Sequence, residues 1–401
     1  MNLMFLIDTL GGGGAERACL NIALSLSAKY RVCVITVFDE PMADYGFSCS
    51  IPIETIGLRI EAPFHKKAEA YLKAVSKLRK LKKKYKTDCC ISFLETANFL
   101  NGIAPAGEKK IISIRNYYSL SMNNESRKVR IIKAKIASKL ADHIVGVSRA
   151  ICADMARNYS ASPEKMSTIY NMVTTYFGKS SEAYGGIYDG FRRLSAAGSV
   201  NFITIGRLSY QKGFRHLIRA FRPVAESIPG SRLFIFGEGD QEEALRNIIR
   251  KNHLEEHVFL PGFDPCIDRY LASADVYVCS SLYEGCSNAM LEAMDKGLPV
   301  ISADCFSGPR EILAPDTDCL TQTDEMETAP YGILVPVCSE NRELTDEPLE
   351  PGETLLARAM IKTGSDPELR DKYGRMSLRR AQDFSEKIIV GKWEELIRKL
   401  C

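Results

Sequence analysis

The chain has 401 residues, of which 45% are hydrophobic and 26% charged, a composition typical of a globular protein long enough for two domains. No run approaches the roughly 20 apolar residues of a membrane span, and the 13 cysteines are scattered without a CxxC pair, which argues against a membrane-spanning protein and a disulfide scaffold. Residues 1–165 carry 26 Lys and Arg against 15 Asp and Glu, so this part has a charge of +11 and the remainder −8. We therefore expect a cytoplasmic protein whose first half meets an anionic partner.

The first half alternates apolar runs with segments of helical periodicity. Strands are predicted at LMFLID, RVCVITVF, Pro52–Ile56, DCCISFL, KIISIRN and HIVGVS. Helices are predicted at Ala15–Tyr30, Phe64–Tyr85, Thr96–Ile103 and Arg127–Leu140. Nearly continuous apolar strands separated by helices indicate a parallel sheet covered on both faces, which is a doubly wound, Rossmann-like domain over residues 1–170.

The pattern stops and then restarts in the second half. Residues 171–200 are rich in Gly, Ser and Tyr and are predicted to form a linker. Strands at NFITIGRL, RLFIFGEG, VFLPG and DVYVCSS then indicate a second doubly wound domain over residues 201–383. Within it, we expect Thr317–Pro330 to be an acidic loop and YGILVP a short edge element.

The segment from Tyr277 to Leu313 carries the most specific chemistry. It predicts a strand, a turn with Glu284, a helix with Glu292 and a second strand. Such a unit binds ligands at the carboxyl ends of its strands, where free N–H groups near Ser287 and Asn288 attract phosphate. Two carboxylates suit hydroxyl groups instead, such as those of a sugar or a ribose.

The spacing of Glu284 and Glu292, with the flanking AMDKGLPVIS and GPREIL, resembles the E-x7-E motif of retaining GT-B glycosyltransferases of the family-4 type. The resemblance implies an α/β fold of two Rossmann-like domains facing a central cleft. Residues 1–170 would bind the acceptor and residues 201–383 the nucleotide-sugar donor, with a C-terminal helix over 384–401 packing back on the first domain. The implied reaction is retaining transfer of a hexose or N-acetylhexosamine from a nucleotide sugar, UDP-linked, to a saccharide or lipid-linked saccharide in cell-surface polysaccharide synthesis.

The resemblance assigns catalytic roles to Glu284, Arg207 and Lys212. Arg207 and Lys212 follow a strand of the second domain, and their charges would neutralise the diphosphate leaving group. Glu284 would hold the hydroxyls of the donor sugar and Glu292 those of the ribose. The remaining donor-binding candidates are turn and helix-start residues: Ser287, Asn288, Gly262, Gly13 and Gly14.

The sugar and acceptor side has weaker candidates. Glu16 follows the glycine run Gly11–Gly14, which could equally be a flexible turn, and Glu311 could equally cap its own helix. Family members often carry a His near the transferred sugar, whereas Arg115 or Asn116 occupies that place here. Arginine is a poor base because it stays protonated, so the leaving phosphate would take the acceptor proton.

No metal or other cofactor is expected. No Asp-x-Asp pair ends a strand, and the five histidines form no cluster along the sequence. Arg207, Lys212 and helix N-termini would do the electrostatic work of a metal.

Two basic segments point to a surface partner. Residues 65–86 carry ten Lys and Arg with one Glu at amphipathic spacing, and residues 127–139 form a second basic helix. Such helices can lie on an anionic membrane, which would make the protein peripheral on the inner face of a membrane. A solvated basic face is the alternative, and nucleic acid is not expected because aromatic residues do not interleave the charges.

Two other functions stay open at this point. One is a nucleotide-sugar epimerase or hydrolase of the same fold. The other is a catalytically silent module that binds a membrane surface.

Overall fold

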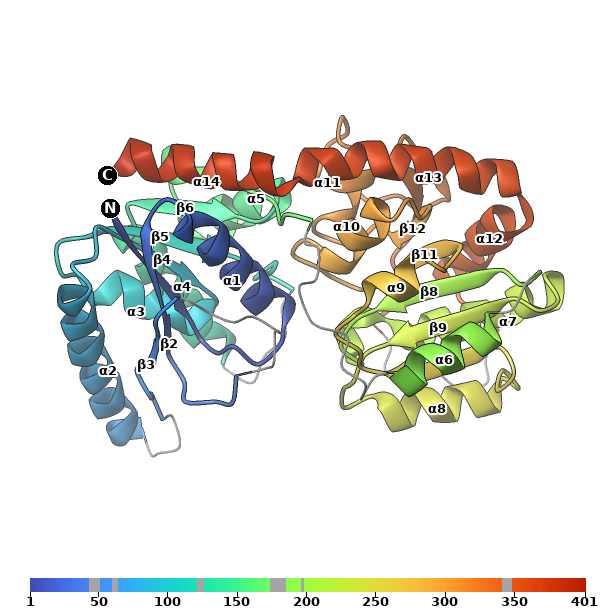
Figure 1. The fold of residues 1–401 in the computed structure, drawn as a ribbon, viewed down its shortest axis with the longest axis horizontal. Coiled ribbons are helices and arrows are strands. Elements are labelled where there is room, and N and C mark those ends of the chain that lie inside the picture. The colour runs from blue at the N-terminus through green and yellow to red at the C-terminus, as the bar shows by residue number, and fades with distance from the viewer. Residues whose placement is uncertain (43–50, 60–63, 121–125, 174–184, 196–197, 341–347) are drawn as a thin grey trace. The chain divides into compact units, whose positions relative to one another are not determined.

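The computed structural model describes residues 1–42, 51–59, 64–120, 126–173, 185–195, 198–340 and 348–401. The chain forms two compact units, Met1–Met172 together with Glu386–Cys401, and Val173–Ser385 (Figure 1). Each unit is built on one seven-stranded sheet with helices between the strands. The predicted α/β fold with two Rossmann-like domains is confirmed.

The first sheet is wholly parallel and has the order β3-β2-β1-β4-β5-β6-β7. Its strands are β1 (Asn2–Ile7), β2 (Arg31–Thr36), β3 (Ile53–Thr55), β4 (Cys89–Phe93), β5 (Lys109–Ile114), β6 (His143–Gly146) and β7 (Met166–Thr168). The helices are α1 (Gly14–Ser27), α2 (Phe64–Lys84), α3 (Glu95–Ile103), α4 (Arg127–Leu140), α5 (Arg149–Tyr159) and α14 (Glu386–Leu400). The order reverses beside β1, so ligands are expected where β1 and β4 end.

Alternation along β1 sends side chains to two separate cores. Leu3, Phe5 and Ile7 pack with α1 and α14 on one face of the sheet. Met4 and Leu6 pack with α2 and α3 on the other face. A strand buried on both faces must be apolar at every buried position, which explains the uninterrupted apolar run LMFLI after Asn2.

Helix α14 belongs to the first unit although it ends the chain. It packs against α1, and its Trp393 is fully buried. The Trp393 ring lies 6.2 Å from that of Phe93 on β4. This contact fastens the C-terminal segment to the centre of the first sheet.

The second sheet has the order β10-β9-β8-β11-β12-β14-β13 and is parallel except at β13. Its strands are β8 (Asn201–Ile205), β9 (Arg232–Phe236), β10 (Val258–Gly262), β11 (Val276–Cys279), β12 (Val300–Ala303), β13 (Glu327–Ala329) and β14 (Gly332–Val335). The helices are α6 (Gly185–Leu194), α7 (Phe214–Ser227), α8 (Glu242–Lys251), α9 (Asp268–Leu271), α10 (Asn288–Asp295), α11 (Pro309–Leu313), α12 (Pro351–Ser365) and α13 (Pro367–Ala381).

Two predictions about this half need correction. The predicted linker 171–200 contains helix α6, because Phe191 is buried with its ring 4.7 Å from that of Phe234; residues 174–184 and 196–197 lie outside the described residues. The predicted loop Thr317–Pro330 contains strand β13, which pairs antiparallel with β14 and takes the edge position. The YGILVP segment is therefore an inner strand.

No helix in the described ranges has the length and apolar character needed to cross a membrane.

Replacing Trp393 by alanine tests the docking of α14. The substitution removes a fully buried indole from the core of the first unit, and we expect a loss of about 3–5 kcal/mol in the free energy of unfolding. Urea denaturation followed by circular dichroism measures the change. Ile388→Ala on the same helix, where Ile388 is 41% exposed, is the control and should stay within about 0.5 kcal/mol of the parent. Equal stability of both variants would contradict the docking.

Candidate active site

The loops after β8, β9 and β11 are bonded to one another by their backbones. Leu208 N donates to Glu238 O at 2.8 Å, and Leu282 N donates to Gln211 O at 2.8 Å. A side chain at Gly213 would place its Cβ 2.1 Å from Ser280 O, so only glycine allows this approach. The three strand ends consequently form one rigid platform.

Lys212 and Glu284 form an ion pair on this platform. Lys212 Nζ lies 2.6 Å from Glu284 Oε1, and the two side chains are 19% and 8% exposed. Ser281 Oγ donates to the same carboxylate oxygen at 2.7 Å. Burial is the largest single influence on the pKa of Lys212 and lowers it. The charge of Glu284, its hydrogen bond and the neighbouring Cys279 and Cys305 together outweigh burial, so the pKa is raised and the ammonium stays charged.

The backbone of Glu284 is fixed by the next turn. Glu284 N donates to Phe306 O at 2.9 Å, and Ser307 N donates back to Glu284 O at 3.2 Å. Ser307 Oγ donates to Gly285 O at 2.8 Å. The backbone that carries the Glu284 side chain is thus fixed by hydrogen bonds to Phe306 and Ser307.

Arg207 lies on the same loop as Lys212. Its side chain is exposed and makes no hydrogen bond or ion pair with another residue of the described ranges. The structure thus places a second, solvated cation after β8 and does not bring it into contact with Glu284.

Helix α10 begins directly after the Glu284 turn. Ser287 is its N-cap and accepts a hydrogen bond from Met290 N at 3.3 Å, so its hydroxyl already serves the helix. Asn288 is the first helical residue, and Glu292 on the following turn is 3% exposed. Gly262 ends β10 with φ +94°, and its carbonyl accepts from Gly237 N at 2.9 Å.

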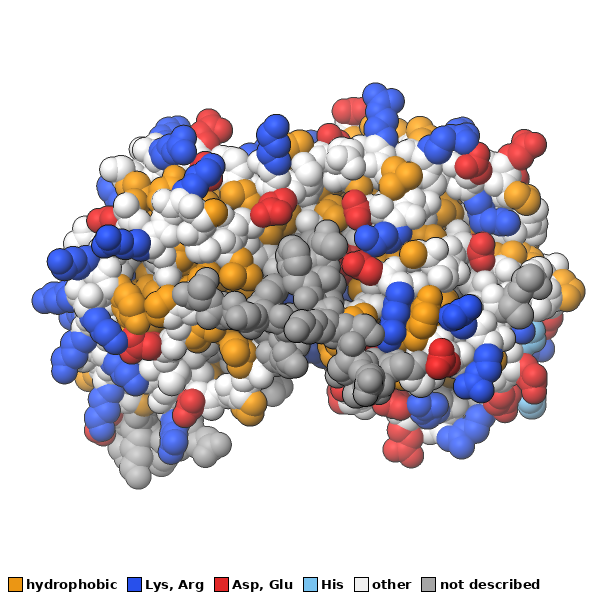
Figure 2. All heavy atoms as spheres, viewed as in Figure 1, with side chains coloured by type: hydrophobic (Ala, Val, Ile, Leu, Met, Phe, Trp, Pro, Cys, Tyr) orange, Lys and Arg blue, Asp and Glu red, His pale blue; other side chains and the backbone are white. Residues whose placement is uncertain are grey.

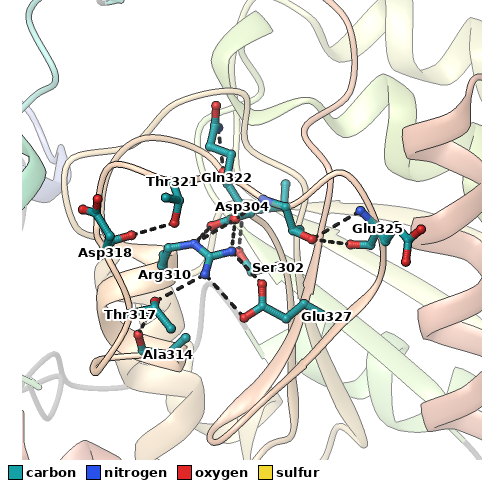
Figure 3. A network of polar contacts seen from close by, with 12 residues as sticks. Ser302, Asp304, Arg310, Ala314, Thr317, Asp318, Thr321, Gln322, Glu325 and Glu327 are labelled. Carbon is teal, nitrogen blue, oxygen red and sulfur yellow. Dashed lines mark hydrogen bonds and ion pairs between the residues drawn. The ribbon is translucent and has the colours of Figure 1, made fainter.

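The Gly308–Glu311 turn has a structural role that the sequence did not reveal (Figure 3). Arg310 Nε lies 3.0 Å from Asp304 Oδ2, and Arg310 Nη2 lies 2.7 Å from Glu327 Oε2. Burial raises the pKa of Asp304, and the hydrogen bond from Arg310 counteracts part of that rise. Glu311 is 1% exposed, and its carbonyl accepts from Arg380. Arg310 thus holds the segment that leads to β13, and no sequence spacing marked Glu327 as its partner.

The Glu16 side chain of helix α1 lies against the glycine run that precedes this helix. Gly13 is the N-cap of α1, and a Cβ there would lie 2.3 Å from Glu16 Oε2. Thr9 Oγ1 donates to Glu16 Oε1 at 3.3 Å. The Glu16 carboxylate lies beside Gly13 at the start of α1, where it complements the helix dipole. In this position the carboxylate opposes a phosphate at the same helix start.

Arg115, the residue expected in place of the family histidine, is 6% exposed at the end of β5. Its Nη2 donates to Asn171 Oδ1, and its guanidinium lies 5.3 Å from the centre of the Phe93 ring. These contacts describe an arginine that joins β5 to the chain after β7. Asn116 follows it in a half-buried position.

Asp8 at the end of β1 is a titratable group that the sequence analysis missed. Its carboxylate accepts from Ala97 N at 2.7 Å and from Thr96 N at 3.4 Å, at the start of α3. Burial raises the pKa of Asp8 to about 7 against the opposing effect of these hydrogen bonds, and the charge of Glu95 adds to the rise. A single Asp before a glycine run belongs to no spacing pattern, so only the fold reveals it.

Within the described ranges, one group of metal-type ligands comes together, formed by His216, Cys338 and Glu350. His216 Nδ1 lies 2.9 Å from Glu353 Oε1, and His216 Nε2 lies 3.1 Å from Ser339 O. Arg215 Nε is also 3.1 Å from His216 Nε2, and its charge opposes a cation. The contacts describe a polar cluster that ties α7 to α12 rather than a metal centre, and sequence spacing did not predict it.

Two family models match the chain. The model described as Glycosyltransferase Family 4 matches residues 12–177, and the model described as Glycosyl transferases group 1 matches residues 192–327. The first match lies in the unit of the glycine run, and the second contains Arg207, Lys212, Glu284 and Glu292.

Two curated relatives illustrate the likeness in sequence. An uncharacterized glycosyltransferase of Methanocaldococcus jannaschii is 40% identical over 199 residues, and that alignment spans about half of each protein (49% and 49%). The N-acetylgalactosamine-N,N'-diacetylbacillosaminyl-diphospho-undecaprenol 4-alpha-N-acetylgalactosaminyltransferase of Campylobacter jejuni is 28% identical over 348 residues, covering 84% of this chain and 86% of the relative.

A solved structure illustrates the likeness in fold. Anabaena HepE in complex with UDP superposes with a TM-score of 0.78 at 21% identity, and all of both chains is covered. The same protein in complex with UDP-glucose gives 0.78 at 20% identity, again over all of both chains. The likeness in fold therefore covers the whole chain.

Replacing Asp8 by asparagine should change how stability depends on pH. The folded pKa of about 7 lies above the ordinary value of 3.8, so the native state holds an extra proton between these values. The free energy of unfolding therefore falls as the pH rises from about 4 to about 7. The asparagine amide would keep the acceptor for Ala97 N without this loss, so Asp8→Asn should match wild type at pH 4 and exceed it at pH 8.

Urea denaturation of both proteins at pH 4, 6 and 8 measures this difference. A stability difference that stays constant over the three pH values would contradict the raised pKa of Asp8.

Proposed function

We propose that this chain, which belongs to the family-4 type of GT-B glycosyltransferases, moves a hexose or N-acetylhexosamine from a UDP-sugar to a saccharide or lipid-linked saccharide with retention of configuration. Glycosyltransferases of this type act in polysaccharide or glycoconjugate biosynthesis. The observation that carries the proposal is the Lys212–Glu284 ion pair on the strand ends of the second unit, with Arg207 on the same loop.

In this proposal Lys212 and Glu284 separate when the donor binds. The diphosphate accepts from Lys212 and Arg207, whose charges stabilise it as the bond to the sugar breaks. Glu284, freed from Lys212, accepts from the hydroxyls of the sugar. The platform beneath both residues is fixed by backbone hydrogen bonds, so little reorganisation is needed during the reaction.

A retaining mechanism is compatible with the lack of a histidine base at the position of Arg115. The leaving phosphate oxygen and the incoming acceptor hydroxyl lie on the same face of the sugar, so the phosphate can take the acceptor proton. No histidine base is then required, which agrees with Arg115 being committed to Asn171 and Phe93.

The nucleotide is assigned to the start of α10. Glu292 is buried one turn inside this helix, and its carboxylate is suited to accept from the two ribose hydroxyls. The complexes of HepE with UDP and with UDP-glucose support a uridine nucleotide. The proposal needs no divalent metal, because Lys212, Arg207 and the α10 N-terminus supply the positive potential.

The name of the Campylobacter relative supports the acceptor. That protein extends a saccharide carried on diphospho-undecaprenol. We assign this chain a lipid-linked saccharide of the same general kind, which would bring the enzyme to a membrane surface through its basic helices α2 and α4.

UDP binding is tested by thermal shift. A ligand in large excess over its dissociation constant stabilises the folded state by roughly 2–4 kcal/mol. We expect a shift with UDP and UDP-sugars, with and without EDTA, and its loss in Arg207→Ala and Lys212→Ala. Lys251→Ala, which removes an exposed cation from the end of α8, is the matched control and should keep the shift. Absence of a shift with UDP in the wild type would remove this nucleotide from the proposal.

Glu284→Gln tests the sugar contact. The amide keeps the size of the side chain but cannot pair with the Lys212 ammonium or accept as strongly from a sugar hydroxyl. We expect transfer to fall by at least about 100-fold, in line with the loss of a transition-state contact of about 3 kcal/mol, while the circular dichroism spectrum is kept. Transfer at the wild-type rate would exclude Glu284 from the site.

A further inference from the structure

Helix α4 presents apolar side chains to solvent. Of the ten large hydrophobic residues that are exposed in the described part of the chain, four lie on α4. They are Val129 (41%), Ile132 (57%), Ile136 (36%) and Leu140 (41%). Their spacing of three, four and four residues puts them on one face of the helix. On helix α2, Leu72 is the exposed large hydrophobic residue among the side chains that the structure describes.

Exposed cations lie along this helix, with Lys128, Lys135 and Lys139 beside the apolar stripe and Arg127 at the helix start. Arg127, Lys128, Lys135 and Lys139 are exposed, and the helix sequence RKVRIIKAKIASKL holds no acidic residue. None of the four forms an ion pair or hydrogen bond with another residue of the described ranges. The outer face of α4 thus combines apolar surface with positive charge that is not neutralised by those residues.

The opposite face of α4 is firmly attached. Ala134, Ala137 and Ser138 are buried, and the helix packs against α3. Arg130 Nη2 donates to Tyr118 O at 2.6 Å, and Lys133 Nζ donates to Tyr71 Oη at 3.0 Å. Because the buried face of α4 already packs against α3, the outer stripe is not a core face that the fold has failed to cover.

Helix α2 differs in that several of its cations are engaged. Figure 2 shows Lys and Arg side chains gathered over this helix. However, Lys82 is buried and lies 2.6 Å from Glu108, Lys84 pairs with Glu54 and Lys73 pairs with Glu69. Lys82 therefore does not belong to the basic face that the sequence predicted. Helix α2 can add long-range attraction, but among its described side chains only Leu72 is a large exposed hydrophobic residue.

We propose that the outer face of α4 docks on an anionic bilayer. Val129, Ile132, Ile136 and Leu140 would enter the boundary between headgroups and acyl chains. The flanking Lys128, Lys135 and Lys139 would contact anionic headgroups. Charge decides the occupant, because a second copy of this face would bring like charges together. The inference deepens the proposed function and rests on its lipid-linked acceptor, since docking through α4 brings the first unit to the surface that carries such a substrate.

Vesicle sedimentation tests the docking with the full chain. We expect binding to vesicles of phosphatidylcholine with phosphatidylserine, weak binding to phosphatidylcholine alone, and release by salt. The double variant Ile132→Glu/Ile136→Glu and the charge variant Lys135→Glu/Lys139→Glu should each bind the anionic vesicles at least about tenfold more weakly. Leu72→Glu on α2 and Ile388→Glu on α14 replace single exposed hydrophobic residues elsewhere and should bind like wild type.

Several outcomes would overturn the proposal. Wild-type protein that stays in the supernatant, α4 variants that sediment like wild type, or loss of binding only in Leu72→Glu would each do so. Wild-type protein that elutes as a dimer in gel filtration, with Ile132→Glu/Ile136→Glu monomeric, would assign the stripe to a second copy instead. Thermal melts by circular dichroism confirm that the variants fold.

The thermal shift with UDP separates this inference from the proposed function. If α4 docks and the donor site is correct, the α4 variants lose vesicle binding but keep the UDP shift, and transfer to a water-soluble acceptor analogue continues. Vesicle binding without any UDP shift in the wild type would refute the donor assignment and leave the docking standing.

Discussion

The ion pair between Lys212 and Glu284 is the interaction on which the functional account depends. Its oxygen and nitrogen are 2.6 Å apart in a largely desolvated position. Removing two charges from water offsets most of their mutual attraction, so a pair of this kind contributes little net stability. Its value lies in preorganisation, because both charges are already in place and dehydrated when a diphosphate and a sugar arrive.

The strand ends and loops of the second unit hold the charges of Lys212 and Glu284 in fixed positions. Parallel strands end at one edge of the sheet, and that edge gathers residues that are far apart in the chain, such as Gly206, Ser280 and Phe306. Close backbone approach at Gly213 then locks neighbouring loops together. The first unit has the same architecture. At the end of its strand β1, Asp8 accepts a hydrogen bond from the start of α3.

Most helices and strands, and the acidic pair, could be predicted from the sequence because they depend on local patterns. Apolar strand runs, helical spacing and the Glu284–Glu292 spacing are all readable along the chain. Contacts between residues that are distant in sequence could not be predicted, because such residues meet only in the folded chain. Examples are Arg310 with Glu327, His216 with Glu353 and Lys82 with Glu108. Helix α6 was missed because its burial depends on Phe191 packing against another strand. The raised pKa of Asp8 likewise arises from burial, which no spacing encodes.

In the proposed mechanism, the second unit binds a nucleoside diphosphate between Lys212, Arg207 and the start of α10. A crystal structure of the protein with UDP tests it most directly. We expect the diphosphate to accept from Lys212 and Arg207, and the ribose hydroxyls to donate to Glu292. Lys212 should then lie farther from Glu284. A UDP bound elsewhere in the chain, with the Lys212–Glu284 pair intact, would contradict it.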